Sequence, residues 1–134
     1  MTASGAIAVA LGSAMGAVLR QATSDVFAAT GTGFFPWDTL TVNVLGSLVI
    51  GWLAALSVPG GRLPLGENRR LFLMGGVCGG FTTFSVFSLE TLALLQAGAL
   101  SLAAVNIAGT LVVCLAAVWV GFALASRMNH RPRP

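Results

Sequence analysis

The sequence is poor in charge and in the side chains that most enzymes use for chemistry. Only 8% of its 134 residues are charged, whereas an ordinary soluble domain carries about 25%. It contains no tyrosine, one histidine and two cysteines, while 56% of its residues are hydrophobic. Such a chain cannot cover its own surface with polar groups, which excludes an ordinary soluble domain and predicts that its solvent is lipid.

The few reactive residues argue against catalysis. Cys78 and Cys114 are far apart and both fall in apolar segments, where a free thiol behaves as a small apolar residue. No pattern resembles a catalytic triad, a zinc site or a phosphate loop, so we expect no enzyme and no disulfide. The pI near 10.2 indicates contact with anionic lipid headgroups rather than with nucleic acid, because no basic helix or aromatic-basic surface exists.

Long uncharged runs are the main feature that is present. A membrane-spanning helix needs about 20 apolar residues, and four runs without charge reach this length: 1–19, 39–61, 71–89 and 91–126. They predict an all-α integral membrane protein, a single four-helix domain over residues 1–134 with a tail at 127–134. The expected helices are 4–22, 39–58, 71–96 and 100–126. Gly98 marks the last turn. A signal peptide is the alternative for the first run, although Arg20 follows its apolar stretch instead of preceding it.

The arginines are distributed unevenly between the two sides of this topology. The positive-inside rule places the arginine-rich side in the cytoplasm, so we expect both termini there. Only Arg20 falls on the opposite side. The six arginines on the side of the termini are Arg62, Arg69, Arg70, Arg127, Arg131 and Arg133.

Three of the predicted helices carry polar or small residues at every fourth position. This spacing places the members of a set within about 80° on one helix face. The alternative for any single member is that it only allows close packing of helices in lipid. This alternative explains Asn43 and Asn106 less well, because a buried amide without partners is costly. The stripes therefore predict a polar path. They are Thr39, Asn43 and Ser47; Asn106, Thr110 and Cys114; and Gly12, Gly16 and Arg20.

The third helix is long enough to be interrupted within the membrane. About 26 residues would span roughly 39 Å against a hydrocarbon core of ~30 Å. We expect a break at Gly75, Gly76, Gly79 and Gly80, where protein, water or an ion must satisfy the freed carbonyls. The alternative is an intact helix in which the glycines form overlapping GxxxG pairs for tight packing. Spacing alone favours neither.

Aromatic rings and hydroxyls share one face beyond these glycines. Phe84, Phe87, Ser88 and Thr91 fall within about 100° of one another. The electropositive edge of a phenylalanine ring attracts an anion without binding it strongly, and conduction requires such moderate attraction. Glu90 would cost ~2.5 to 3.5 kcal/mol at the bilayer centre, so it should face protein or water.

These motifs together resemble the Fluc, or CrcB-type, family of bacterial fluoride channels. The resemblance rests on "GGFTTFSVFSLE" at 79–90, "TLTVNVLGSLVIG" at 39–51 and "GAVLRQ" at 16–21, and it covers nearly the whole chain. It implies a dual-topology homodimer of two antiparallel subunits in the bacterial inner membrane, with two fluoride pores and passive export of fluoride.

The resemblance also implies roles for individual residues. A structural Na⁺ at the dimer centre would be held by the backbone carbonyls of Gly79 and Thr82. Phe84 and Phe87 match the pore phenylalanines and Asn43 matches the pore asparagine, while Arg20 matches a basic residue at the vestibule. The remaining residues of the fluoride pore would be Thr39, Ser85, Ser88, Glu90, Thr91, Asn106 and Thr110.

Two features depart from the family pattern. Asn106 and Thr110 stand where the family commonly has a tyrosine and a serine. The arginine bias of six against one is also unexpected for a protein that inserts in both orientations.

Two other classes of protein remain as alternatives. A small proton-coupled multidrug exporter also has four short helices, but it needs a membrane carboxylate, normally in the first helix. That helix has none here, and Glu90 is the one substitute. A non-transporting membrane scaffold would require Asn43 and the phenylalanines only for assembly.

Overall fold

The computed structural model describes residues 2–31, 33–58 and 60–130, and these residues form helices and connecting turns with no strand. Four helical stretches are long and apolar enough to cross a membrane: Ala3–Thr30, Trp37–Leu56, Glu67–Gln96 and Leu100–Asn129. The prediction of an all-α fold with four membrane-length helices is therefore confirmed. Arg131 and Arg133, predicted to lie in a cytoplasmic tail, fall outside the described residues.

Helix α1 (Ala3–Thr30) is longer than predicted. It begins after Thr2, whose hydroxyl oxygen accepts a hydrogen bond from the Gly5 amide at 3.2 Å. The predicted end at residue 22 is wrong, because polar residues beyond the apolar run continue the helix. Gln21 donates to Asp25 one turn further on at 2.9 Å. The helix stops at Gly31, whose φ of 62° is a left-handed conformation that glycine adopts readily.

Helices α2 (Trp37–Leu56) and α6 (Leu100–His130) lie within two and four residues of their predicted ends. The predicted turn before α6 is confirmed at Gly98, which has a φ of 74°. Near its C-terminal end α6 is tied to α2 through Asn129. The Asn129 amide nitrogen donates to Ala55 O at 2.8 Å, and its oxygen accepts from the Arg62 amide at 3.0 Å.

The third span consists of several pieces. Helix α3 (Glu67–Arg70), the π-helical segment η1 (Leu71–Cys78) and α4 (Gly79–Phe81) follow one another without a gap. Thr82 and Thr83 are extended, with ψ values of 160° and 123°, and α5 (Phe84–Gln96) begins after them. The expected position of the break was wrong: the glycines at 75, 76, 79 and 80 are helical, and the interruption follows them.

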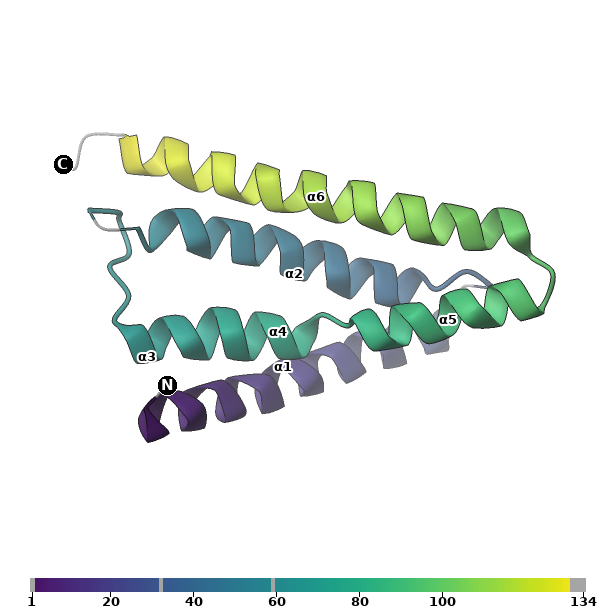
Figure 1. Cartoon of the computed structure of the whole chain (residues 1–134), viewed down its shortest axis with the longest axis horizontal. Coiled ribbons are helices and arrows are strands. Elements are labelled where there is room, and N and C mark those ends of the chain that lie inside the picture. The colour runs from purple at the N-terminus through teal and green to yellow at the C-terminus, as the bar shows by residue number, and fades with distance from the viewer. Residues whose placement is uncertain (1, 32, 59, 131–134) are drawn as a thin grey trace.

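Figure 1 shows two layers of helices: α2 and α6 run side by side, and the third span runs opposite them with α1 packed against it. The starts of α1 and α3 and the end of α6 lie at the same end of the molecule. Glycines bring the backbones together in both pairs. A Cβ at Gly121 of α6 would lie 3.0 Å from the amide nitrogen of Trp52 in α2.

Glycines also mediate the contact between α1 and the third span. A Cβ at Gly76 would lie 2.8 Å from Gly12 Cα, and one at Gly80 would lie 2.8 Å from Ser13 Cα, so neither site has room for a larger residue. Tight packing, the alternative considered for these glycines, therefore describes Gly76 and Gly80, although the span is not an intact helix.

Large apolar side chains cover the outside of the molecule. Leu11 and Val18 of α1 are 60% and 69% exposed, and Trp119 of α6 is 70% exposed. The largest buried cluster is small and consists of Ala55, Leu56 and Ala125. An apolar exterior around a small interior is the arrangement expected of helices that pack in lipid through small residues.

Candidate functional site

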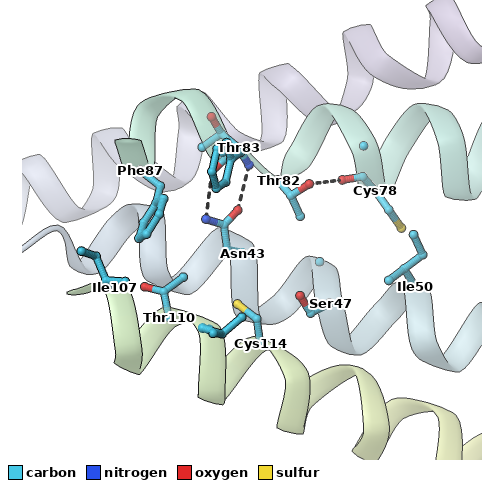
Figure 2. Close-up of a pocket in the computed structure, with 14 residues that line it drawn as sticks. Asn43, Ser47, Ile50, Cys78, Thr82, Thr83, Phe87, Ile107, Thr110 and Cys114 are labelled. Carbon is cyan, nitrogen blue, oxygen red and sulfur yellow. Dashed lines mark hydrogen bonds between the residues drawn. The ribbon is translucent and has the colours of Figure 1, made fainter. Parts of the chain in front are cut away.

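A groove of about 560 Å³ opens between α2, α6 and the interrupted third span (Figure 2). None of its fourteen lining residues is charged, and amide, hydroxyl and thiol groups alternate with aliphatic and aromatic ones. The lining residues are Asn43, Gly46, Ser47 and Ile50 of α2; Cys78, Gly79, Thr82, Thr83, Phe84 and Phe87 of the third span; and Ile107, Thr110, Leu111 and Cys114 of α6.

Asn43 holds the interrupted backbone from the side of α2. The Thr83 amide donates to Asn43 Oδ1 at 2.8 Å, and Asn43 Nδ2 donates to Thr83 O at 3.0 Å, as Figure 2 shows. The side-chain amide thus supplies the partners that an extended residue at membrane depth would otherwise lack. Gly46 allows the close approach, because a Cβ there would overlap the Thr82 methyl group.

The interruption separates carbonyl groups at the end of α4 from their helical donors, and those of Gly79 and Thr82 are two of them. In an unbroken helix the Thr83 amide would donate to Gly79 O and the Val86 amide to Thr82 O. Here the Thr83 amide donates to Asn43, and the Val86 amide donates at 3.2 Å to the Thr83 hydroxyl, which caps α5. Gly79 and Thr82 both line the groove, and each has a carbonyl oxygen without its helical donor.

Two phenylalanine rings stand at the start of α5. The ring centroids of Phe84 and Phe87 are 5.7 Å apart and the rings are tilted by 40°. Phe84 is 79% exposed, whereas Phe87 is half-buried and its ring points toward Thr110 on α6 (Figure 2). The groove therefore has an aromatic wall on α5 and a hydroxyl on α6.

Two side-chain hydrogen bonds outside the groove lining connect α5 to α2 and α6. Thr39 of α2 donates to Glu90 Oε1 at 2.8 Å, and Asn106 of α6 donates to Thr91 Oγ1 at 2.9 Å. Thr39 and Asn106 are both buried. The second carboxylate oxygen of Glu90 is buried without a hydrogen-bond partner among the described residues. Glu90 also borders a separate cavity of about 290 Å³, which Asp38 shares.

The structure brings only part of the predicted site together. Thr39, Glu90, Thr91 and Asn106 do not line the groove and lie in the contacts of α5 with α2 and α6. Three more do not line the groove: Ser85 and Ser88 are exposed on α5, and Arg20 is half-buried on α1. The predicted residues that do line it are Asn43, Gly79, Thr82, Phe84, Phe87 and Thr110.

Sequence reasoning missed Thr83, whose backbone and side chain organise the interruption. A threonine directly before an apolar helix is a common N-cap residue, and this rule could have identified it. Ser47 and Cys114, members of the predicted polar stripes outside the predicted pore set, line the groove, and both cysteines are free thiols.

Comparison with known proteins places these features in a family. A family model described as CrcB-like protein, Camphor Resistance (CrcB), matches residues 7–122. A protein of Paramagnetospirillum magneticum named fluoride-specific ion channel FluC is 50% identical over 122 residues, which are 91% of this chain and 95% of that protein. Proteins with the same name are 50% identical in Opitutus terrae, over 90% of this chain and 92% of that protein, and 46% identical in Methylocella silvestris, over 91% and 93%.

Proposed function

The chain belongs to the CrcB-like family, and from that membership we infer that it is a fluoride-selective ion channel of the bacterial inner membrane. Its four membrane-length helices make it a multi-pass membrane protein. The observation on the chain itself that carries the proposal is the groove, a lining without charge that combines an amide, hydroxyls and ring edges beside an interrupted helix.

A fluoride ion that sheds its water needs other donors in its place. The groove offers the second Nδ2 hydrogen of Asn43, the hydroxyl of Ser47 and the electropositive edges of the Phe84 and Phe87 rings. None of these groups carries a full positive charge, so the attraction is moderate and the ion can leave. Thr110 adds a hydroxyl to the groove lining. Of the predicted pore residues outside the lining, exposed Ser85 and Ser88 on α5 and half-buried Arg20 on α1 would extend the route beyond the groove. Thr39, Glu90 and Thr91 would support it through their contacts between helices.

A second copy of the chain, inserted in the opposite orientation, closes the groove. Phe84 is 79% exposed in the single chain and leaves an aromatic surface for this partner. A two-fold axis in the membrane plane gives an isologous contact, in which both copies use the same surface. Each copy contributes one groove, so the dimer has two pores.

The carbonyls at the interruption fit a structural sodium ion. Gly79 and Thr82 supply neutral oxygen ligands, the kind that unwound membrane helices offer to Na⁺. The surroundings of Gly79 are open, since a Cβ there would meet no atom nearer than Met74 O at 3.9 Å. A bound sodium ion would satisfy these carbonyls and join the two subunits at their centre.

Passive export follows from the acid chemistry of fluoride. Neutral HF enters the cell from an acidic medium and dissociates in the more alkaline cytoplasm. The resulting F⁻ cannot cross lipid, so it accumulates until it leaves through the channel down its electrochemical gradient.

The deciding experiment is efflux from liposomes that contain the purified protein, measured with fluoride and with chloride. We expect fluoride efflux from the native protein and little chloride efflux. Phe84→Ile and Phe87→Ile should slow fluoride efflux by about tenfold or more, equivalent to ~1.4 kcal/mol on the barrier. Phe122→Ile, a half-exposed phenylalanine of α6 that does not line the groove, is the matched control.

Two outcomes contradict the proposal. One is the absence of fluoride efflux from protein that is folded and inserted in the liposomes. The other is chloride efflux as fast as fluoride efflux, which indicates a nonselective pore.

A further inference from the structure

Side chains of α2 and α6 help to fix the orientation of helix α5. It begins after the extended residues Thr82 and Thr83, so no continuous helix fixes its rotation relative to α4. Two side chains of α2 form hydrogen bonds in this region: Asn43 bonds the backbone of Thr83, and Thr39 donates to Glu90. From α6, the hydrogen bond between Asn106 and Thr91 is the one side-chain hydrogen bond to α5 in the described part of the chain.

Asn106 is the centre of a short series of hydrogen bonds that joins the two walls of the groove. Thr110 Oγ1 donates to Asn106 Oδ1 at 3.4 Å, and Asn106 Nδ2 donates to Thr91 Oγ1 at 2.9 Å. Thr91 Oγ1 in turn donates to Phe87 O at 2.7 Å. The series begins at a groove residue of α6 and ends on the backbone of the residue whose ring forms the opposite wall.

Burial gives this series its importance. Asn106 is 1% exposed and Thr91 is 8% exposed, so water does not compete for their hydrogen bonds. The 3.4 Å contact between Thr110 Oγ1 and Asn106 Oδ1 is longer than an ordinary hydroxyl hydrogen bond, so the bond from Asn106 to Thr91 is the stronger link of the series.

We propose that Asn106 is a positioning residue of the permeation groove. It fixes the rotation of α5 against α6, and so the placement of the Phe87 ring relative to Thr110. Asn106 acts through these neighbours and does not touch the ion. This inference rests on the proposed function as a fluoride channel.

The test replaces Asn106 by leucine, which has a similar volume and no amide. We expect Asn106→Leu to form the same oligomer as the native protein but to conduct fluoride about tenfold more slowly in liposomes, with a lower ratio of fluoride to chloride efflux. Thr91→Val removes the same hydrogen bond from the other side and should give the same two changes. The double variant should be no slower than either single one, because both changes break one interaction.

Asn129→Leu is the matched control on the same helix. The Asn129 amide also donates and accepts hydrogen bonds between elements, but at the end of α6 and away from the groove. We expect this variant to melt at a lower temperature while its fluoride flux per inserted protein and its selectivity stay native.

The outcomes separate this inference from the proposed function. A native protein that conducts no fluoride overturns the channel assignment. The positioning role of Asn106 is overturned if the native protein conducts fluoride and both variants, Asn106→Leu and Thr91→Val, keep the native flux and selectivity. An Asn129→Leu variant with the same loss of selectivity overturns it as well, since general destabilisation would then explain both. If Asn106→Leu does not fold, the flux and selectivity of Thr91→Val alone test the positioning role.

Discussion

At the scale of single residues, Asn43 does for an extended backbone what a neighbouring strand does in a β-sheet. Its amide has the same donor and acceptor as a peptide group, and it pairs with both backbone groups of Thr83. A lipid environment offers no substitute partners. The interruption can therefore persist at membrane depth because a side chain from α2 replaces the missing helical bonds.

Replacing Asn43 by leucine should loosen the interruption. Asn43→Leu removes the Asn43 partner of both the Thr83 amide and the Thr83 carbonyl, and two such losses should destabilise the fold by about 2 to 6 kcal/mol. We expect the Thr83 amide, which donates to Asn43 in the native protein, to exchange its hydrogen faster in the variant. Asn68→Leu is the control, because among the described residues the Asn68 side chain bonds only the exposed Ser4 side chain, at 3.3 Å. Unchanged exchange at Thr83 in Asn43→Leu would contradict this role.

Several residues of the groove can be predicted from the sequence, but their partners cannot. The four-residue spacing of Asn43 and Ser47, and of Thr110 and Cys114, places them on helix faces, and all of them line the groove. Asn106 shares the second stripe but is buried against α5. Periodicity gives the direction of a side chain on its own helix, whereas its partner depends on how the helices pack.

At the scale of elements, the predicted helix bounds were wrong where the surroundings of a helix, rather than its own sequence pattern, determine where it ends. Apolar run length predicts where a helix is surrounded by lipid, and all four membrane-length helices were found in this way. It does not predict where a helix stops in water, and α1 therefore continues past its apolar run to Gly31. The interruption before α5 follows the glycines, and Gly76 and Gly80 instead lie in close contact with the α1 backbone.

Adding a methyl group at Gly16 should separate α1 from the third span. A Cβ there would overlap Val77 O and lie 2.6 Å from the Phe81 amide nitrogen, so backbone atoms would have to move. Overpacking of this kind typically costs about 1 to 3 kcal/mol, and Gly16→Ala should lower the melting temperature in detergent accordingly. Gly109→Ala is the control, since a Cβ at Gly109 meets nothing within 4 Å. Equal melting temperatures for the two variants would contradict the close packing.

At the scale of the whole molecule, the arginines are hard to reconcile with an antiparallel dimer. Arg62, Arg69, Arg70 and Arg127 belong to the end of the molecule where α1 and α3 begin and α6 ends, and Arg20 lies far along α1. The positive-inside rule favours one orientation for such a chain. An antiparallel dimer therefore requires that some chains insert against this bias, and contacts at its centre can stabilise the pair once both orientations are present. In our proposal this stabilisation comes from a sodium ion that is bound by the carbonyls of Gly79 and Thr82.

A methyl group at Gly79 should test that centre without disturbing the subunit. Within one chain a Cβ at Gly79 lies no closer than 3.9 Å to any atom, and one at Gly75, a turn earlier, no closer than 3.7 Å. Both alanine variants should therefore fold as single chains. If the Gly79 carbonyl faces a shared sodium ion, Gly79→Ala should reduce the dimer fraction, whereas Gly75→Ala should not.

Sodium dependence provides the second measurement on the same pair of variants. A ligand that binds only the assembled state at 100 times its Kd stabilises that state by about 2.7 kcal/mol. The melting temperature of the native dimer should therefore fall when sodium is replaced by N-methylglucamine, and Gly75→Ala should behave in the same way. Gly79→Ala should melt at the same temperature in both salts. If the melting temperature of the native dimer does not depend on sodium, the proposed sodium site is wrong. If Gly75→Ala and Gly79→Ala show the same change in melting temperature, the sodium site does not involve Gly79.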